Sequence, residues 1–207
     1  MATVYLFGAG ASRGYRGSRT GVVPPLAKDY FSTFHKLAIS ADFEVKIGFI
    51  VNYVRDTRGI APDEQPRDFD EDIERVFAEV DRELSSTFDG HADRSDMPSV
   101  VKRFGLVKTY DQFVFWFSHV LNEIQNGDPC KVSGTLLERI QKDDVLLTFN
   151  WDTILDRALY HTGRWFPDDG YGVRFDGLLD GSWRASKATS SSHLLLKLHG
   201  STNWFGP

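Results

Sequence analysis

Three short apolar runs, each ended by a turn of small or polar residues, constrain the fold of this chain more than any other feature. The runs are TVYLF at residues 3–7, DVLLTF at 144–149 and LLLKL at 194–198. Short continuous apolar runs are typical of strands in a buried parallel sheet. The turns that follow them are GAGAS, NWDT and HGSTN. Because parallel strands end at the same sheet edge, we expect the three turns to converge where open α/β sheets bind ligands.

The long segment between the first two predicted strands has mostly helical patterns. Apolar residues of DIERVFAEVDREL, at 72–84, recur at helical spacing, with acids and arginines on the opposite face. A buried helix is predicted over 111–125, which contains FVFWFSHVL, and a third helix over 43–54. We therefore expect one domain over 1–207 with a helical insertion, or small lobe, at about 43–130.

Two polar stretches, 85–99 and 180–192, are predicted to be mobile loops. The strands that the sequence shows are fewer than the roughly five or six of a doubly wound sheet. Either further strands lie in irregular sequence, or the chain ends before its fold does.

Composition and charge exclude several classes of protein. The formal net charge is −5, with 24 basic and 29 acidic residues, and the absence of a long basic run argues against nucleic-acid binding. A single cysteine, Cys130, allows neither an internal disulfide nor a cysteine-rich zinc site. No apolar stretch reaches the roughly 18 residues of a membrane span, and the N-terminus lacks the features of a secretory signal. We expect a cytoplasmic protein that contacts neither membrane nor nucleic acid.

The sequence also offers no convincing metal site. The acidic stretch 68–79 matches the spacing of a calcium-binding loop, but Ile73 stands where that loop needs glycine. The histidines show no spacing typical of metal ligands. We therefore expect no bound metal.

The first turn, at residues 8–12, has the composition of a phosphate-binding loop. Gly8 and Gly10 would let the backbone bend tightly and approach a ligand, and a helix beginning there would direct N–H groups at a phosphate. The dinucleotide-binding fingerprint needs a third glycine, however, where this chain has Arg13. Taken alone, the segment is explained equally well as a tight turn without a ligand.

Polar residues that could carry chemistry follow the other two predicted strands. Asp152 could begin the predicted helix TILDRALYH as its N-cap, or it could belong to a site. A helix start does not explain Asn150, whose amide needs hydrogen-bond partners or a ligand. For His199, as an isolated histidine, a structural role is the simpler interpretation.

Taken together and in this order, the three turns resemble those of the sirtuin-like superfamily of NAD-consuming domains. That family has a GAG-x-S turn, a T-x-N-x-D turn and a catalytic His-Gly, which correspond here to FGAGAS, TFNWD and KLHGS. Pro24-Pro25 lies where the family has a proline-containing loop over its cofactor. EDIERVF resembles a helix of the bacterial branch that acts in antiphage defence. The resemblance spans residues 5–204 and implies an α/β fold, with a Rossmann-like, mostly parallel sheet and a large helical insertion.

The resemblance implies that NAD is bound as a substrate and that three residues are catalytic. Asn150 would bind ribose hydroxyls or orient water, and Asp152 would fix the turn or face the nicotinamide ribose. His199 would act as a general base, a role in which histidine is common. The residues implied to contact NAD are Gly8, Ala9, Gly10, Ala11, Ser12, Pro25, Thr148, Asn150, Asp152, Gly200 and Ser201.

Two departures from deacylating sirtuins decide the expected reaction. Those enzymes carry a four-cysteine zinc module, which Cys130 alone cannot form. Their groove for the acyl-lysine peptide lies beyond the His-Gly turn, where little of this sequence remains. We therefore expect an NAD hydrolase that releases nicotinamide and ADP-ribose and depletes NAD as an antiphage effector. A non-catalytic module that binds NAD or ADP-ribose is the alternative, and the missing cysteines disfavour a protein deacylase.

The family also implies partners and a longer fold. Such an activity needs restraint, so a fused or separate sensor domain is expected, and assembly into a homo-oligomer follows by analogy alone. The later strands of the family's fold would come after residue 204, which implies that this chain ends before the fold is complete.

Overall fold

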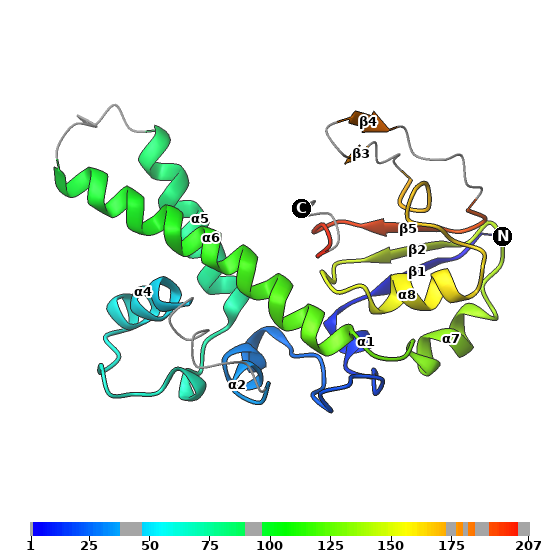
Figure 1. Cartoon of the computed structure of the whole chain (residues 1–207), viewed down its shortest axis with the longest axis horizontal. Coiled ribbons are helices and arrows are strands. Elements are labelled where there is room, and N and C mark those ends of the chain that lie inside the picture. Colours follow the sequence, from blue (N-terminus) through cyan, green and yellow to red (C-terminus); the bar gives the residue numbers. More distant parts are fainter. Residues whose placement is uncertain are drawn as a thin grey trace. The chain divides into compact units, whose positions relative to one another are not determined.

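The computed structural model of the chain describes residues 2–37, 47–89, 97–172, 177–179, 182–184 and 191–202 (Figure 1). The chain divides into two compact units. The sheet unit consists of Met1–Pro24 together with Leu121–Pro207, and the helical unit is Pro25–Val120. The expected insertion at about 43–130 overlaps the helical unit, which begins and ends earlier in the chain.

Parallel strands form the centre of the sheet unit. They are hydrogen-bonded in the order β1-β2-β5. Their bounds are Val4–Phe7 for β1, Val145–Thr148 for β2 and Leu194–Lys197 for β5. The register places Phe7 beside Thr148 and Thr148 beside Lys197, so all three strands end at one edge. The three predicted strands are confirmed, each to within one residue at either end, but β1 is not buried as expected, because Val4 and Leu6 on one of its faces are exposed. The fold is α/β with a parallel sheet compatible with a Rossmann-like arrangement.

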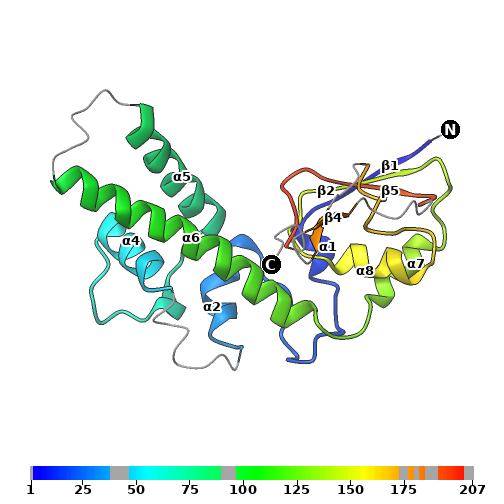
Figure 2. The same cartoon turned by 45° about the horizontal axis from the view of Figure 1, so that its top comes forward.

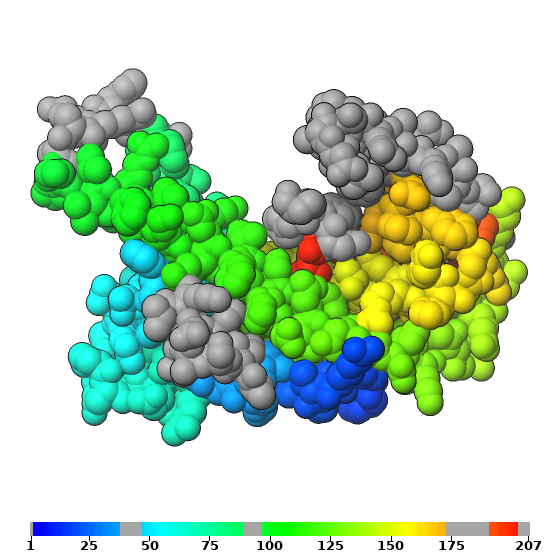
Figure 3. Space-filling model, viewed as in Figure 1, coloured from blue at the N-terminus to red at the C-terminus, as the bar shows by residue number. Residues whose placement is uncertain are grey.

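Helices α7 (Lys131–Leu137) and α8 (Ile154–His161) lie along one face of this sheet (Figure 2). Leu146 and Leu195 point into the layer between sheet and helices and are completely buried. The buried core of this layer consists of Leu137, Ile140, Leu146, Leu155, Ala158, Leu159, Trp165, Tyr171 and Leu195. Figure 3 shows the outer side of α8, in yellow, on the surface of the sheet unit.

Short elements complete the sheet unit. Helix α1 (Ala9–Ser12) follows β1 after a single residue, as the first turn predicted. Strands β3 (Gly177–Leu179) and β4 (Ser182–Arg184) pair with each other as a two-stranded antiparallel ribbon. The prediction of a loop over 180–192 is therefore wrong at β4, while 180–181 and 185–190 lie outside the described residues.

The helical unit is built around aromatic side chains. Trp116 is completely buried, and its ring lies 5.0 Å from that of Phe31 and 5.1 Å from that of Tyr30, between centroids. The elements are η1 (Ala27–Asp29), α2 (Tyr30–Phe34), α4 (Gly48–Arg58), η2 (Pro66–Asp68), α5 (Ile73–Asp89) and α6 (Met97–Gln125), the last of which runs on into the sheet unit.

The three predicted helices are present as α4, α5 and α6, but two of them are longer than expected. Residues 43–46 of the predicted helix over 43–54 lie outside the described residues, and α4 continues to Arg58. Residues 85–89 continue α5 and 97–99 begin α6, so the predicted loop over 85–99 is wrong at both ends, and 90–96 lie outside the described residues. The hydroxyls of Ser86 and Thr87 donate to carbonyls one turn earlier in α5, which lets polar residues stay helical. None of the described helices is long and apolar enough to cross a membrane.

Candidate functional site

The three predicted turns meet at the carboxyl edge of the sheet. Hydrogen bonds continue one residue beyond the strands, since the Phe149 N–H donates to Phe7 O at 3.3 Å and the Leu198 N–H donates to Thr148 O at 3.0 Å. Beyond that point the rings of Phe149 and His199 contact edge to face, with 5.2 Å between centroids. The second and third turns are therefore direct neighbours.

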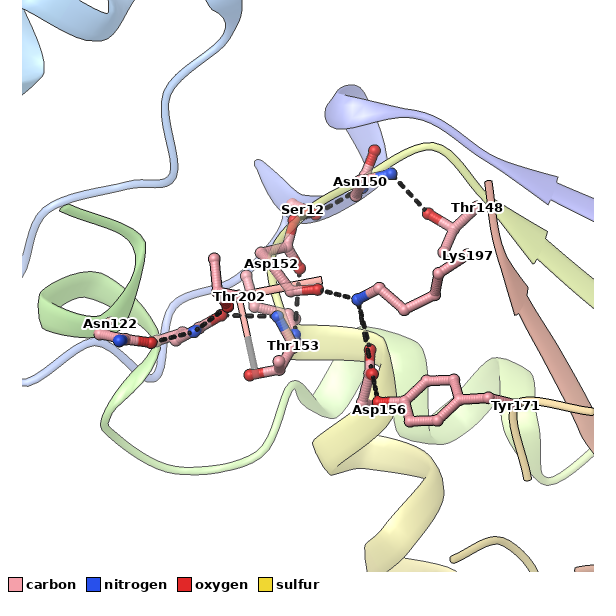
Figure 4. Close-up of polar contacts among 12 residues, drawn as sticks. Ser12, Asn122, Thr148, Asn150, Asp152, Thr153, Asp156, Tyr171, Lys197 and Thr202 are labelled. Atoms are coloured by element: carbon pink, nitrogen blue, oxygen red, sulfur yellow. Dashed lines mark hydrogen bonds and ion pairs between the residues drawn. The ribbon is translucent and has the colours of Figure 1, made fainter. Parts of the chain in front are cut away.

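Asn150 ties the second turn to the first (Figure 4). Its Nδ2 donates to Gly8 O at 3.0 Å and to Ser12 Oγ at 2.8 Å, and its backbone N–H donates to Thr148 Oγ1 at 3.0 Å. Both amide hydrogens are thus used inside the protein. Asn150 Oδ1 accepts no hydrogen bond from the described residues, so this oxygen is available to a donor on a ligand.

Asp152 is buried and its carboxylate is occupied by the protein itself. Oδ2 accepts from the Ser12 hydroxyl at 2.6 Å, and Oδ1 accepts from the Ile154 N–H at 3.0 Å. Burial raises the pKa of Asp152, although its bonds to Ser12 and Ile154 and the charge of Lys197 act in the opposite direction. The N-cap of α8 is Thr153, so Asp152 is not the N-cap but the residue before it, and its bond to Ile154 holds the first N–H of the helix. The geometry favours this structural role over contact with a ligand.

A buried ion pair lies beside Asp152 and was not predicted from the sequence. The Lys197 side chain is 0% exposed, and its Nζ lies 3.1 Å from Asp156 Oδ2. Nζ also donates to the backbone O of Asp152 at 2.5 Å, and the Tyr171 hydroxyl donates to Asp156. The available signal was a lysine inside the apolar run LLLKL, in alternation with the buried Leu195.

The backbone of the first turn is open above Gly8 and Gly10. Both glycines are exposed, and a Cβ added at either position would meet no atom within 4 Å. Neither has the positive φ that favours glycine. Since neither packing nor backbone conformation requires glycine here, the close approach of a ligand remains as a physical reason for it. Ala9 and Ala11 are also exposed.

The third turn contains both exposed and buried members of the predicted site. His199 is exposed and forms no hydrogen bond with the described residues. Gly200 has φ +84°, a conformation that requires glycine in practice. Ser201 is 5% exposed, and its Oγ has no hydrogen-bond partner in the described part of the chain. The Thr202 N–H donates to Trp151 O at 2.9 Å, which fastens this turn to the second.

The remaining predicted residues differ in their placement. Thr148 is buried, and its hydroxyl accepts from Asn150, so it supports the turn. Pro25 belongs to the helical unit, and its place over a cofactor stays a prediction. Within the described ranges, no group of three or more His, Cys, Asp or Glu residues could hold a metal ion.

Two hollows adjoin α8. One of about 20 Å³, enough for a single water molecule, is lined by Ser12, Thr148, Asn150 and Asp152 among others. The other, of about 230 Å³, is lined by residues of α8 and by Trp165 and Tyr171, and it is lined by none of the site residues predicted from the sequence. The small hollow therefore belongs to the candidate site, and the large one does not.

No family model and no curated protein matches this sequence. The interpretation of the site therefore depends on the geometry of its residues. That geometry consists of an open glycine backbone after β1, an amide that is fixed after β2 and an exposed histidine after β5.

Proposed function

We propose that the protein binds NAD at the carboxyl edge of its sheet and hydrolyses it to nicotinamide and ADP-ribose. The observation that supports this most is the Asn150 amide, which is fixed by Gly8 O and Ser12 Oγ with its own oxygen left available. The resemblance of the three turns to sirtuin-like domains supplies the identity of the ligand. The meeting of those turns at one sheet edge is what such a ligand site requires.

The first turn would bind the pyrophosphate. The open backbone over Gly8 and Gly10 lets a phosphate approach closely, and the first turn of a helix leaves N–H groups without an acceptor inside the helix. The Ser12 hydroxyl donates its hydrogen bond to Asp152. Ser12 would therefore stabilise the turn and would not donate to the phosphate.

Breaking the bond between nicotinamide and ribose needs little acid catalysis, because the nicotinamide group of NAD is cationic and leaves as a neutral molecule. The site must stabilise an oxocarbenium-like ribose and deliver water. Asn150 Oδ1 can only accept, so it would take a hydrogen bond from a ribose hydroxyl or from the attacking water. His199 would accept the proton of that water, giving nicotinamide, ADP-ribose and a proton from NAD and water.

Asp152 has a different role in this proposal from the catalytic one that the resemblance implied. Because both carboxylate oxygens accept hydrogen bonds from the protein, Asp152 would act through Ser12 to hold the Asn150 amide. Direct contact with the nicotinamide ribose would require these bonds to break.

The cellular role follows from the reaction. An enzyme that depletes NAD in the bacterial cytoplasm would act as an antiphage effector, and it would need restraint by a sensor domain, a partner or assembly into a homo-oligomer. The resemblance to the defence branch of the family supports this role.

A non-catalytic module that binds NAD or ADP-ribose is the second candidate. The observation that favours it is His199, whose imidazole has no hydrogen-bond partner among the described residues to orient it as a base. Binding of ADP-ribose without turnover of NAD would establish this second function.

The deciding experiment is NAD consumption by the purified chain, with nicotinamide, ADP-ribose and acetylated ADP-ribose resolved by chromatography. Wild type, Asn150→Ala and His199→Ala are compared, each with and without an acetyl-lysine peptide. Peptide-independent ADP-ribose that is lost in both variants supports the hydrolase. Release of nicotinamide only with the peptide would show a deacylase, and calorimetry with ADP-ribose separates a binding module from a protein that binds neither compound.

A further inference from the structure

Lys197 is buried where a parallel strand ordinarily carries an apolar side chain. Its side chain is 0% exposed and that of its partner Asp156 is 5% exposed. Removing two charges from water is costly, and apolar residues of similar volume often give equal or greater stability than a buried ion pair. Stability alone therefore does not account for this pair.

The ion pair fixes the backbone of the second turn from within the core. Lys197 Nζ lies between the Asp156 carboxylate, at 3.1 and 3.4 Å, and the backbone O of Asp152, at 2.5 Å. Tyr171 donates a further hydrogen bond to Asp156 from the segment after α8. Figure 4 shows these four residues joined in one chain of contacts.

The same chain of contacts reaches the Asn150 amide and determines which way it faces. Ser12 has a single hydroxyl hydrogen, which it donates in a hydrogen bond to the Asp152 carboxylate. Ser12 Oγ can therefore only accept a hydrogen bond from Asn150. Gly8 O, the second partner of the amide, is also an acceptor. The NH₂ group of Asn150 must therefore face inward, and its oxygen must face the open side.

We propose that Lys197, Asp156 and Tyr171 are positioning residues that hold the Asn150 amide oxygen toward the reacting ribose. They act through Asp152 and Ser12, and none of the three touches the substrate. This inference rests on the proposed function for its consequence in catalysis, whereas the orientation of the amide is a property of the free protein.

The test replaces all three side chains, so that no charge or hydroxyl among them is left unpaired. The backbone O of Asp152 loses its donor, while the Asp152 carboxylate keeps its bonds from Ser12 and Ile154. Lys197→Met alone leaves Asp156 buried without its cation and is expected to lower the melting temperature. The triple variant Lys197→Met, Asp156→Leu, Tyr171→Phe is expected to melt within a few degrees of wild type or above it. Its kcat for NAD is expected to fall roughly ten- to a hundredfold, with KM changed less than about threefold. If the triple variant regains the stability of wild type but not its activity, a purely structural role of the three residues cannot explain the result.

A second readout needs no substrate. The side-chain NH₂ signals of Asn150, identified in ¹H–¹⁵N spectra by their loss in Asn150→Ala, report the two hydrogen bonds of the amide. In the triple variant these signals are expected to shift and to exchange faster with water.

The matched control is Asp144→Asn, at the opposite end of the second strand. Asp144 accepts from the N–H groups of Thr3 and Gln141 at 2.8 and 2.9 Å, at the sheet edge where β2 begins and opposite to the candidate site. Its replacement is expected to change stability and to leave the Asn150 signals unchanged.

A folded triple variant with wild-type kcat, or with unchanged Asn150 side-chain signals, would overturn the inference. If the wild type neither binds nor hydrolyses NAD, the proposed function fails. The NMR comparison then decides the positioning role by itself.

Discussion

At the scale of single residues, the hydrogens of the Asn150 amide distinguish it from a carboxylate of the same shape. Asn150→Asp cannot donate to Gly8 O, and it places a charge beside that carbonyl and Ser12 Oγ. We expect kcat/KM for NAD to fall by about a hundredfold or more, as for Asn150→Ala, because the outward oxygen loses its orientation. Near-normal turnover in Asn150→Asp would show that the orientation of the amide does not contribute to catalysis.

The buried carboxyl of Asp152 predicts a pH dependence of stability. Burial raises its pKa in the fold above the ordinary value of about 3.9, so the folded state binds the proton more tightly than the unfolded state. Its contribution to the free energy of unfolding is therefore complete below the ordinary pKa, and it decreases as pH rises through the raised value.

Asp152→Asn is expected to abolish this decrease, since an amide does not titrate. Its oxygen can still accept from the Ile154 N–H, while its NH₂ group would donate to Ser12 Oγ, which reverses the direction of that bond. Urea unfolding at intervals between about pH 2 and 8 measures the difference between the two proteins and covers the range below about pH 3.9 in which the contribution of Asp144 is lost. Asp144 provides the opposite control, because two backbone N–H groups lower its pKa and its contribution is lost as pH falls. Parallel curves for wild type and Asp152→Asn would contradict the assignment.

At the scale of elements, a substitution in the turn between β1 and α1 tests what binding requires separately from what folding requires. Gly10 lies inside α1 with open space where a Cβ would be, so Gly10→Ala is expected to keep stability or raise it by up to about 1 kcal/mol. The same methyl group would stand where backbone must meet phosphate. We expect the affinity for ADP-ribose to fall at least about tenfold, measured by calorimetry.

Gly163→Ala is the control for that variant. Gly163 follows α8 with φ +69°, so alanine is strained there and should lower stability without changing affinity. Equal affinity of wild type and Gly10→Ala would leave the first turn as a tight turn without a ligand.

At the scale of the whole molecule, the helical unit has a core of its own, centred on Trp116. The side chain is completely buried among aromatic rings, so Trp116→Ala is expected to cost about 3–5 kcal/mol of the free energy of unfolding. Its neighbour Phe115 is 45% exposed, and Phe115→Ala should cost much less. Urea unfolding of both variants checks the prediction, and similar losses for the two would place the core elsewhere.

The prediction of the helical unit from sequence was right about helices and wrong about where α5 ends and where α6 begins. Local hydrophobic spacing predicted α5, because a helix buries residues that recur every three or four positions, and the apolar run FVFWFSHVL predicted the buried part of α6. Polar residues at 85–89 suggested a loop, yet hydroxyls that bond back to carbonyls satisfy them within α5. Composition alone does not show whether such a hydroxyl faces solvent or the preceding turn.

The sequence by itself determined the three strands and the turns that follow them. Exposing a short apolar run to water costs free energy, so a run of this kind between polar turns can be recognised as a strand from the local sequence alone. The presence of Asn150 and His199 at strand ends follows from their position after such runs.

Only the tertiary structure decided what those residues contact. Asn150 meets Gly8 across 142 positions of the chain and Ser12 across 138, while Lys197 meets Asp156 across 41. These contacts exist because β1 and β5 pair on either side of β2 in one register. Pairing between distant segments leaves no local pattern in a sequence, so the partners of the Asn150 amide and of the buried Lys197 could be found only in the folded chain.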